Sequence, residues 1–580
     1  MALSSAVYAS DNKIELQQLG DQNFAELAQS GTNLTAEARQ EGNANVVRID
    51  QLGGFNFLWY SFGNTADSYQ MGNSNNTSIE QGSFSNNAYS SQDGSDNRTD
   101  ISQSLSAGND AWSTLSGDGN QSVVAQLVGG DNDGYILVTG HGNFAEIEQW
   151  AAQNNAEIVA TGDSNDAEIL QFGMSNDASI IQQGDSNMAS VEQAGLSGDA
   201  EIVQYGNANT TVIEQLGDDA TALTNAQGDG NQQYISQVGA GQAAQSVVIG
   251  DNNETRQVQG GLFGADSEST VGVLGQGNMV SSAQAGTNHR VAQLAVGDGN
   301  NMEATQQGTA QQAELVYVGD ANTANVMQSG ADHTIAFLGV GDGNNAVLSQ
   351  VGTNNSVLLA TEGNYNTFDL TQEQYDNTLF GIVTGDSNTV DVSQGGYNNA
   401  VDFMIDGNSN DVSLTEGAAR INSEATINIV GDNNALDAAG RIGTHQHLNI
   451  DLVGDDNHIY SRQYNARVSL DITTEGQHVT GNQVDVDKMV PTSSISLLSA
   501  GNVNTVFATQ RGTDPFSSDV YNTIEGIDGD GGFLVGGDNG YVELYQQGRD
   551  NLIQGAQMSD TSTMIVSQTG QMNRAIVTQY

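Results

Sequence analysis

The sequence predicts an all-β protein: a β-solenoid of two-strand coils stacked in cross-β fashion. Three observations predict it. A glycine recurs every 11 residues over most of the chain, polar and apolar residues alternate within each unit, and Gly, Asp and Asn gather at the junctions. A short period kept along a chain is typical of stacked repeats, in which each unit contacts only its neighbours. The clearest run of turn glycines is Gly162, Gly173, Gly184, Gly195 and Gly206.

Each 11-residue unit is expected to form one strand and one turn. With the glycine as position 1, positions 4, 6, 8 and 10 hold Asn, two apolar residues and Gln. Alternate strand residues share a face, so these four are expected to point inward. The expected aliphatic core includes Ala167, Ile169, Ala178, Ile180, Ala189, Val191, Ala200 and Ile202. The expected inward amides are Asn165, Gln171, Asn176, Gln182, Asn187, Gln193, Gln204, Asn209, Gln215, Asn573 and Gln579.

Two units facing each other make a coil of about 22 residues, which can bury its apolar face only by stacking at a spacing of about 4.8 Å. A buried amide without a partner costs several kcal/mol, but stacked Asn and Gln can bond to one another and fix the register. In each turn we expect the glycine to supply a positive φ and the following Asp or Asn to make local bonds. A helix is excluded, because a glycine and a turn cluster in every period would break it.

The regularity of the repeat predicts the organisation of the chain. Residues 11–416 form the regular solenoid, with slips between 53 and 117; residues 417–536 are degenerate and contain both prolines, Pro491 and Pro515; residues 537–580 are regular terminal repeats. Proline removes a ladder donor and marks loops or bulges. Residues 1–10 end like a signal-peptide cleavage region, so we expect a signal remnant or a disordered tail.

The composition restricts the partners. Lys and Arg number 14 against 70 Asp and Glu, a formal net charge of −56. Nucleic acid is therefore not expected as a partner, because binding phosphates requires clustered Lys and Arg. Cysteine is absent, and no run approaches the ~20 apolar residues of a transmembrane helix. Copies of so acidic a chain repel one another, so assembly is expected to need salt or non-specifically bound Ca²⁺, and no cofactor is expected.

The repeat resembles a known family. Gln171, Gly173, Asn176, Ala178 and Gln182 follow the pattern Q-x-G-x2-N-x-A-x3-Q. The same pattern returns at Gln568, Gly570, Asn573, Ala575 and Gln579. This pattern resembles the curlin repeat of curli-type amyloid fibres in bacterial biofilm matrices, here in an unusually long and acidic member. The resemblance implies an extracellular β-solenoid that adds end to end to copies of itself, assisted by a secretion channel and a nucleator.

One alternative to the fibre remains: a monomeric, capped β-solenoid that acts as an adhesin or surface-binding module. The segments 14–16 and 576–578 show no obvious cap, which favours open edges and assembly. No catalytic motif is present, so we do not expect an enzyme. His445 and His447 would share one strand face, and G-D-x-N recurs, but solvated strand residues and turn chemistry explain both, so no metal site is expected.

Overall fold

The computed structural model describes residues 11–53, 63–419, 423–437, 446–453, 458–460, 468–475, 493–500, 505–511, 522–525, 533–535, 541–549, 551–559 and 561–580. The chain divides into two compact units, Met1–Asn288 and His289–Tyr580. Within the described residues of both units, all the regular elements are β-strands, which confirms the all-β prediction.

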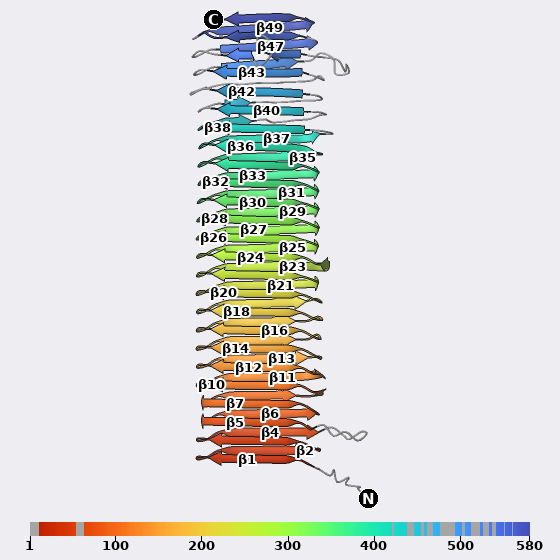
Figure 1. Ribbon diagram of the computed structural model, residues 1–580, viewed down its shortest axis with the longest axis vertical. Helices are drawn as coiled ribbons and strands as arrows, with labels where there is room; N and C mark the ends of the chain where they lie inside the picture. The colour runs from red at the N-terminus through yellow and green to blue at the C-terminus, as the bar shows by residue number, and fades with distance from the viewer. Residues whose placement is uncertain are drawn as a thin grey trace. The chain divides into compact units, whose positions relative to one another are not determined.

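The first unit consists of two facing sheets of stacked parallel strands (Figure 1). We call one of them the mixed sheet, because its inward positions vary from coil to coil. It comprises β1 (Lys13–Leu19), β3 (Thr35–Glu41), β5 (Thr65–Asn73), β7 (Asn87–Ser95), β10 (Asp110–Ser116), β12 (Asp133–Thr139), β14 (Asn155–Thr161), β16 (Asp177–Gln183), β18 (Asp199–Tyr205), β20 (Thr221–Gln227), β22 (Ala243–Ile249) and β24 (Glu268–Leu274).

We call the facing sheet the amide sheet, because an Asn precedes each of its main strands and a Gln lies near the end of each. It comprises β2 (Phe24–Ser30), β4 (Val46–Gly53), β6 (Asn76–Ser83), β8 (Arg98–Gln103), β11 (Gln121–Gly130), β13 (Phe144–Trp150), β15 (Asp166–Gln171), β17 (Met188–Gln193), β19 (Thr210–Leu216), β21 (Gln232–Ala240), β23 (Glu254–Ala265) and β25 (Met279–Thr287). The short β9 (Ser106–Ala107) pairs with the end of β11.

The second unit has the same two sheets. Its mixed sheet comprises β26 (Arg290–Val296), β28 (Gln312–Val318), β30 (Thr334–Val340), β32 (Ser356–Glu362), β34 (Thr378–Thr384), β36 (Asn399–Asp406), β38 (Ser423–Val430), β40 (Gln446–Val453), β42 (Val468–Glu475), β43 (Ser493–Ala500), β45 (Asn522–Glu525), β46 (Phe533–Val535), β48 (Leu552–Gln557) and β50 (Arg574–Gln579).

The amide sheet of the second unit comprises β27 (Asn301–Thr309), β29 (Thr323–Ala331), β31 (Asn345–Thr353), β33 (Thr367–Tyr375), β35 (Thr389–Gly396), β37 (Asp411–Ala419), β39 (Ala435–Asp437) and β41 (His458–Tyr460). A separate three-stranded sheet holds β44 (Thr505–Arg511), β47 (Tyr541–Arg549) and β49 (Thr563–Gln571). Strands thus continue into the segment expected to be degenerate, while Pro491, Pro515 and residues 1–10 lie outside the described residues.

Strands stack in parallel and in register, each paired with the strand one coil later. In β15 and β17, Ala167 pairs with Ala189 and Ile169 with Val191, a step of 22 residues. Register is strongly specified here, because a slip of one residue would turn every buried side chain to solvent. These pairings confirm the predicted β-solenoid of two-strand coils.

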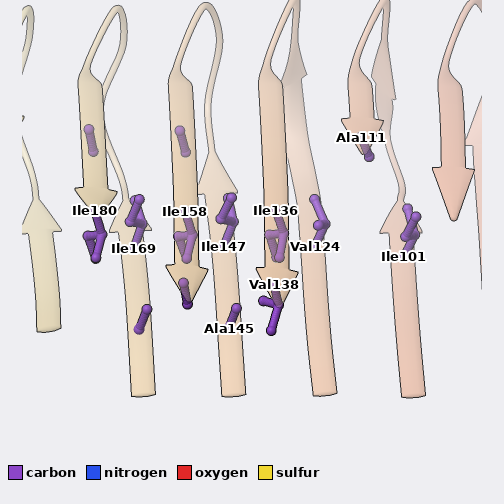
Figure 2. Packing of buried hydrophobic residues seen from close by; sticks show 14 of the residues in the cluster. Ile101, Ala111, Val124, Ile136, Val138, Ala145, Ile147, Ile158, Ile169 and Ile180 are labelled. Carbon is purple, nitrogen blue, oxygen red and sulfur yellow. The ribbon is translucent and has the colours of Figure 1, made fainter. Parts of the chain in front are cut away.

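The core lies between the two sheets as columns of aliphatic side chains. Figure 2 shows Ile136, Ile158 and Ile180 of the mixed sheet in one column, facing Val124, Ile147 and Ile169 of the amide sheet. All six are fully buried. Burying such a side chain contributes about 1.5–3 kcal/mol, so the repeated columns are the main source of stability.

The expected slips of the repeat change the length of a coil but not its register. Gln51 of β4 pairs with Gln81 of β6, 30 residues later, and still donates a hydrogen bond to it at 2.8 Å. Gln103 and Gln126 are 23 residues apart and are bonded in the same way. The inward amides therefore hold the register where the sequence spacing does not.

Candidate assembly surface

The glutamines of the amide sheet form a continuous hydrogen-bonded ladder in each unit. Gln171 Nε2 donates to Gln193 Oε1 at 2.9 Å and to the backbone carbonyl of Asn155 at 2.9 Å. Gln193 repeats the pair of bonds toward Gln215 and the carbonyl of Asp177. These side chains are buried, and because each amide is bonded on both sides, the cost of an unpaired buried amide is avoided.

The ladder has a direction, since each glutamine donates toward the coil that follows it in sequence. In the first unit it runs through Gln29, Gln51, Gln81, Gln103, Gln126, Gln149, Gln171, Gln193, Gln215, Gln237, Gln259 and Gln284. In the second unit it runs through Gln306, Gln328, Gln350, Gln372 and Gln394.

A second ladder of asparagines lies where the chain enters each strand of the amide sheet. Asn187 Oδ1 accepts the backbone N–H of Asn209 at 3.0 Å. Asn187 Nδ2 donates to Asn165 Oδ1 at 3.1 Å and to the carbonyl of Gly206 at 2.8 Å. Each asparagine thus links three successive coils at the turn.

The mixed sheet does not maintain these ladders. Gln182 donates to Gln204 at 3.1 Å, but the preceding positions in this column are Leu115, Val138 and Ala160. Asn176 Oδ1 accepts the N–H of Gly198, which has no side chain to continue the column. The 11-residue units, treated alike in the sequence analysis, therefore fall into two classes with a true repeat of 22 residues.

A buried histidine occupies the asparagine position in one coil of the mixed sheet of the second unit. His333 Nδ1 accepts the N–H of Asn355 at 3.3 Å, and its Nε2 lies 3.1 Å from the carbonyl of Ser329. Burial lowers the pKa of His333, which favours the neutral ring that these two contacts require.

The turn glycines have two different backbone conformations. Gly162, Gly184 and Gly206 enter the amide sheet with φ of 123°, 123° and 117°. Gly173 and Gly195, in the opposite turns, are not among the positive-φ glycines, so the expected positive φ is wrong for them. A Cβ at any of the five would overlap the carbonyl oxygen of the glycine one coil later. The close stacking of successive coils is therefore the reason that both kinds of turn require glycine at position 1.

Position 3 has a left-handed conformation in both classes of turn, including the turns whose glycine at position 1 has no positive φ. Its φ is 59° at Ser164, 60° at Ser175, 59° at Ser186, 58° at Ser197 and 55° at Ala208. The identity of these residues carries no signal for the turn, because Ser and Ala have no special preference for that conformation.

The acidic residues at position 2 also bond differently from expectation. Asp185 Oδ1 accepts the backbone N–H of Asp163 at 2.8 Å, and Asp163 Oδ1 accepts that of His141 at 2.8 Å. These bonds join neighbouring coils, whereas the sequence analysis expected local turn bonds. The Asp of the recurring G-D-x-N motif thus links neighbouring coils of the stack.

No metal site emerges in the part of the chain described. Within it, no group of three or more His, Asp or Glu side chains could hold a metal ion. His447 lies in β40, in register with Glu424, and His445 lies outside the described residues.

The outer faces bring like charges into register. Glu146 of β13 pairs directly with Glu168 of β15. Burial raises the pKa of Glu146, and the nearby carboxylates of Glu168, Glu148 and Asp166 raise it further. Asp133 beside Asp110, and Asp391 beside Asp369 and Asp411, have pKa values raised for the same two reasons.

We expect Glu146→Gln to stabilise the first unit at neutral pH by several tenths of a kcal/mol, the range of directly opposed like charges. A raised carboxyl pKa means that the folded state binds more protons than the unfolded state above the ordinary value of 4.5, so stability falls as pH rises through that window. The gain should therefore disappear below that value. The urea midpoints of unfolding at pH 7 and pH 4 measure this change in stability.

Glu314→Gln is the control, because the in-register neighbours of Glu314, Ala292 and Ala336, are neutral. An equal gain in stability there would contradict the account.

Within the described residues, the outer end of the core at the N-terminal strands is not covered by another strand. Ile14 and Leu16 of β1 are 52% and 46% exposed, whereas their in-register partners Ala36 and Ala38 are buried. In the part of the chain that the structure describes, Gln29 Oε1 has no hydrogen-bond partner. Among the described residues, no strand pairs with the outer edges of β1 and β2.

The C-terminal strands have the opposite character. Gln546 Nε2 donates to Gln568 Oε1 at 3.1 Å, and Gln568 Nε2 donates to the carbonyl of Leu552 at 3.1 Å. Gln579 lies on the inward side of β50, half-exposed, and Asn573 accepts no ladder bond from a later coil within the described residues. The last glutamines of the chain therefore point amide donors away from the preceding coil, whereas the ladder of the first unit begins at Gln29 on an acceptor.

The fold and its ladders define a class: a parallel β-solenoid held together by stacked amides. A family model described as the curlin associated repeat matches residues 9–42, 72–104, 140–173, 162–195, 341–373 and 385–415. The chain carries curlin-associated repeats in these segments, and such repeats on a β-solenoid fold suit a structural or fibre protein of the cell exterior. A search of curated proteins found no match to the chain. Within the described residues, no helix has the length and apolar character needed to cross a membrane.

Proposed function

We propose that this protein is a secreted structural subunit that adds end to end to copies of itself, building a curli-like extracellular fibre of a biofilm matrix or cell surface. The observation that carries the proposal is the direction of the glutamine ladder. One end of the chain offers amide donors, the other an unpartnered amide acceptor, and exposed strand edges template further pairing. Catalysis has no part in this role; a secretion channel and a nucleator are its expected accessories.

The two ends match residue by residue. If β49 of one copy stacks on β1 of the next, Gln568 meets Gln18 and Gly570 meets Gly20, while Met564 and Val566 cover Ile14 and Leu16. If β50 stacks on β2 in the same way, Gln579 meets Gln29 and Asn573 meets Asn23. Both ladders would then continue across the junction, and the exposed apolar residues would be buried.

The net charge of −56 opposes this contact, so assembly should require screening. We expect growth to accelerate with ionic strength. CaCl₂ and NaCl compared at equal ionic strength separate general screening from a contribution of the divalent ion. The proposal itself calls for no dedicated Ca²⁺ site.

Seeded growth followed at single fibre ends tests the proposal. Wild-type seeds are first incubated with Gln579→Glu protein, whose N-terminal edge can still dock on the C-terminal end of a seed. The docked protein then presents its own C-terminal end, where the new carboxylate would face Gln29 Oε1 of the next chain. When wild-type chains are then added, we expect normal growth at the untreated end and growth at the other end slowed by about fivefold or more, because the orphaned groups cost ~1–3 kcal/mol.

The control is Thr578→Glu, which places the same charge on the outward side of the same strand. Seeds treated with it should grow at both ends. Growth at both ends after Gln579→Glu treatment would refute the junction, and wild-type chains that stay single and ignore seeds would refute end-to-end assembly altogether.

A further inference from the structure

The second unit carries an unusual apolar surface on the outward side of its mixed sheet, over β26, β28, β30, β32, β34 and β36. We call it the apolar face. Its central column is in register from coil to coil, and two shorter flanks lie beside it. The column is Leu294, Val316, Leu338, Ala360, Ile382 and Met404; the flanks are Val318 and Val340 on one side and Leu358 and Phe380 on the other.

The apolar face is large for a surface left in water. Eight of its side chains are 37–48% exposed: Leu294, Val318, Leu338, Val340, Leu358, Phe380, Ile382 and Met404. Together they leave on the order of 500 Å² of apolar area open, comparable to the largest patch of a typical monomer. Patches of this size are often functional.

The apolar face also carries few charges, on a chain whose net charge is −56. Its outward charged residues are Arg290, Glu314 and Glu362 and, on the last strand β36, Asp402 and Asp406. The matching outward column of the first unit is likewise apolar, with Val159, Ile181 and Val203. There, however, acidic residues lie beside it: Asp133, Glu157, Asp177, Asp199 and Glu201. The second unit therefore offers a face on which two like-charged chains can approach.

We propose that the apolar face is a lateral docking surface for a second copy of this chain, so that fibres run in pairs. Flat sheet faces with columns of side chains pack about 10 Å apart, and pairing two apolar faces would bury on the order of 1,000 Å², where specific interfaces begin. This inference rests on the proposed function, because an end-to-end fibre repeats the face along its length. Many weak contacts then act together, and the pairing becomes strong.

The test compares Leu338→Glu with Met327→Glu in fibres of the full chain. Leu338 is at the centre of the apolar face and 45% exposed; Met327 is on β29, on the outer side of the opposite sheet, and 50% exposed. Electron microscopy gives the mass per length, and the seeded growth rate reports end-to-end addition separately. We expect Leu338→Glu to halve the mass per length with growth within about twofold of wild type, the scale of an exposed charge change, and Met327→Glu to change neither.

Equal mass per length in wild-type and Leu338→Glu fibres would overturn the proposal and leave the apolar face to a different partner. Ile382→Glu, in the same column, must act like Leu338→Glu; a wild-type mass per length there would also overturn the proposal.

If wild-type chains form no fibres, the proposed function fails, and sedimentation equilibrium of single chains decides whether two chains pair through the apolar face. Dimers abolished by Leu338→Glu would support it, and monomers in both samples would overturn it.

Discussion

Gly297→Ala is expected to destabilise the start of the second unit by about 3 kcal/mol or more, combining backbone strain with lost stacking bonds. Gly297 has a φ of 119°, and a Cβ there would overlap the carbonyl oxygen of Gly319 one coil later. Beside it, the N–H of Gly319 donates to the carbonyl of Val296 at 2.9 Å. The coils must separate to admit a methyl group, so hydrogen exchange of the amides in β27 and β29 should accelerate.

Gly299→Ala is the control within the same turn. Gly299 has a φ of 67°, and a Cβ there meets no atom within 4 Å. Ala310 and Ala321 already occupy the equivalent conformation in other turns. We therefore expect a cost of only about 1–2 kcal/mol, that of a left-handed alanine. Equal exchange rates in the two variants would show that backbone strain, rather than coil stacking, requires glycine at position 1.

Gln193→Leu is expected to cost about 2–6 kcal/mol, because it orphans two buried amide groups at ~1–3 kcal/mol each. Gln171 Nε2 would lose one of its two acceptors and keep one N–H unpaired, and Gln215 Oε1 would lose its donor. Leucine fills the space but can make neither bond. Local protection of β15, β17 and β19 against hydrogen exchange measures the effect.

Gln182→Leu, one strand earlier on the mixed sheet, provides the comparison. Gln182 Oε1 has no partner, and the preceding residue in its column is Ala160, so the substitution orphans only Gln204 Oε1. We expect about half the loss seen at Gln193, since one amide group is orphaned instead of two. A loss at Gln182 as large as that at Gln193 would mean that the continuity of the ladder contributes nothing.

Much of the architecture could be predicted from the sequence, because period and alternation are local properties. Ala167, Ile169 and Gln171 occupy alternate positions of one strand, and the structure buries all three. The same reasoning could not identify hydrogen-bond partners that lie one coil away. The carboxylate of Asp185 accepts from the backbone of Asp163, a pairing that no local turn preference encodes.

The difference between the two sheets did leave a trace in the sequence. Asn187, Asn209, Asn231 and Asn253 recur at steps of 22 residues, whereas the intervening units carry Gly198, Ala220 and Gln242 at the same position. An 11-residue alignment averages the two classes. Asparagine is required in every coil of the amide sheet because the loss of one residue would interrupt a continuous hydrogen-bonded ladder. A column that apolar residues already interrupt tolerates further changes.

The most direct test of the account is a cryo-electron-microscopy reconstruction of seeded fibres at a resolution that separates strands. The account predicts stacking without interruption through the junction between copies, with Gln568 beside Gln18 and Gln579 beside Gln29. Single chains whose β1 edge is covered by other residues, or fibres in which the ends of neighbouring chains do not pair strand on strand, would contradict it.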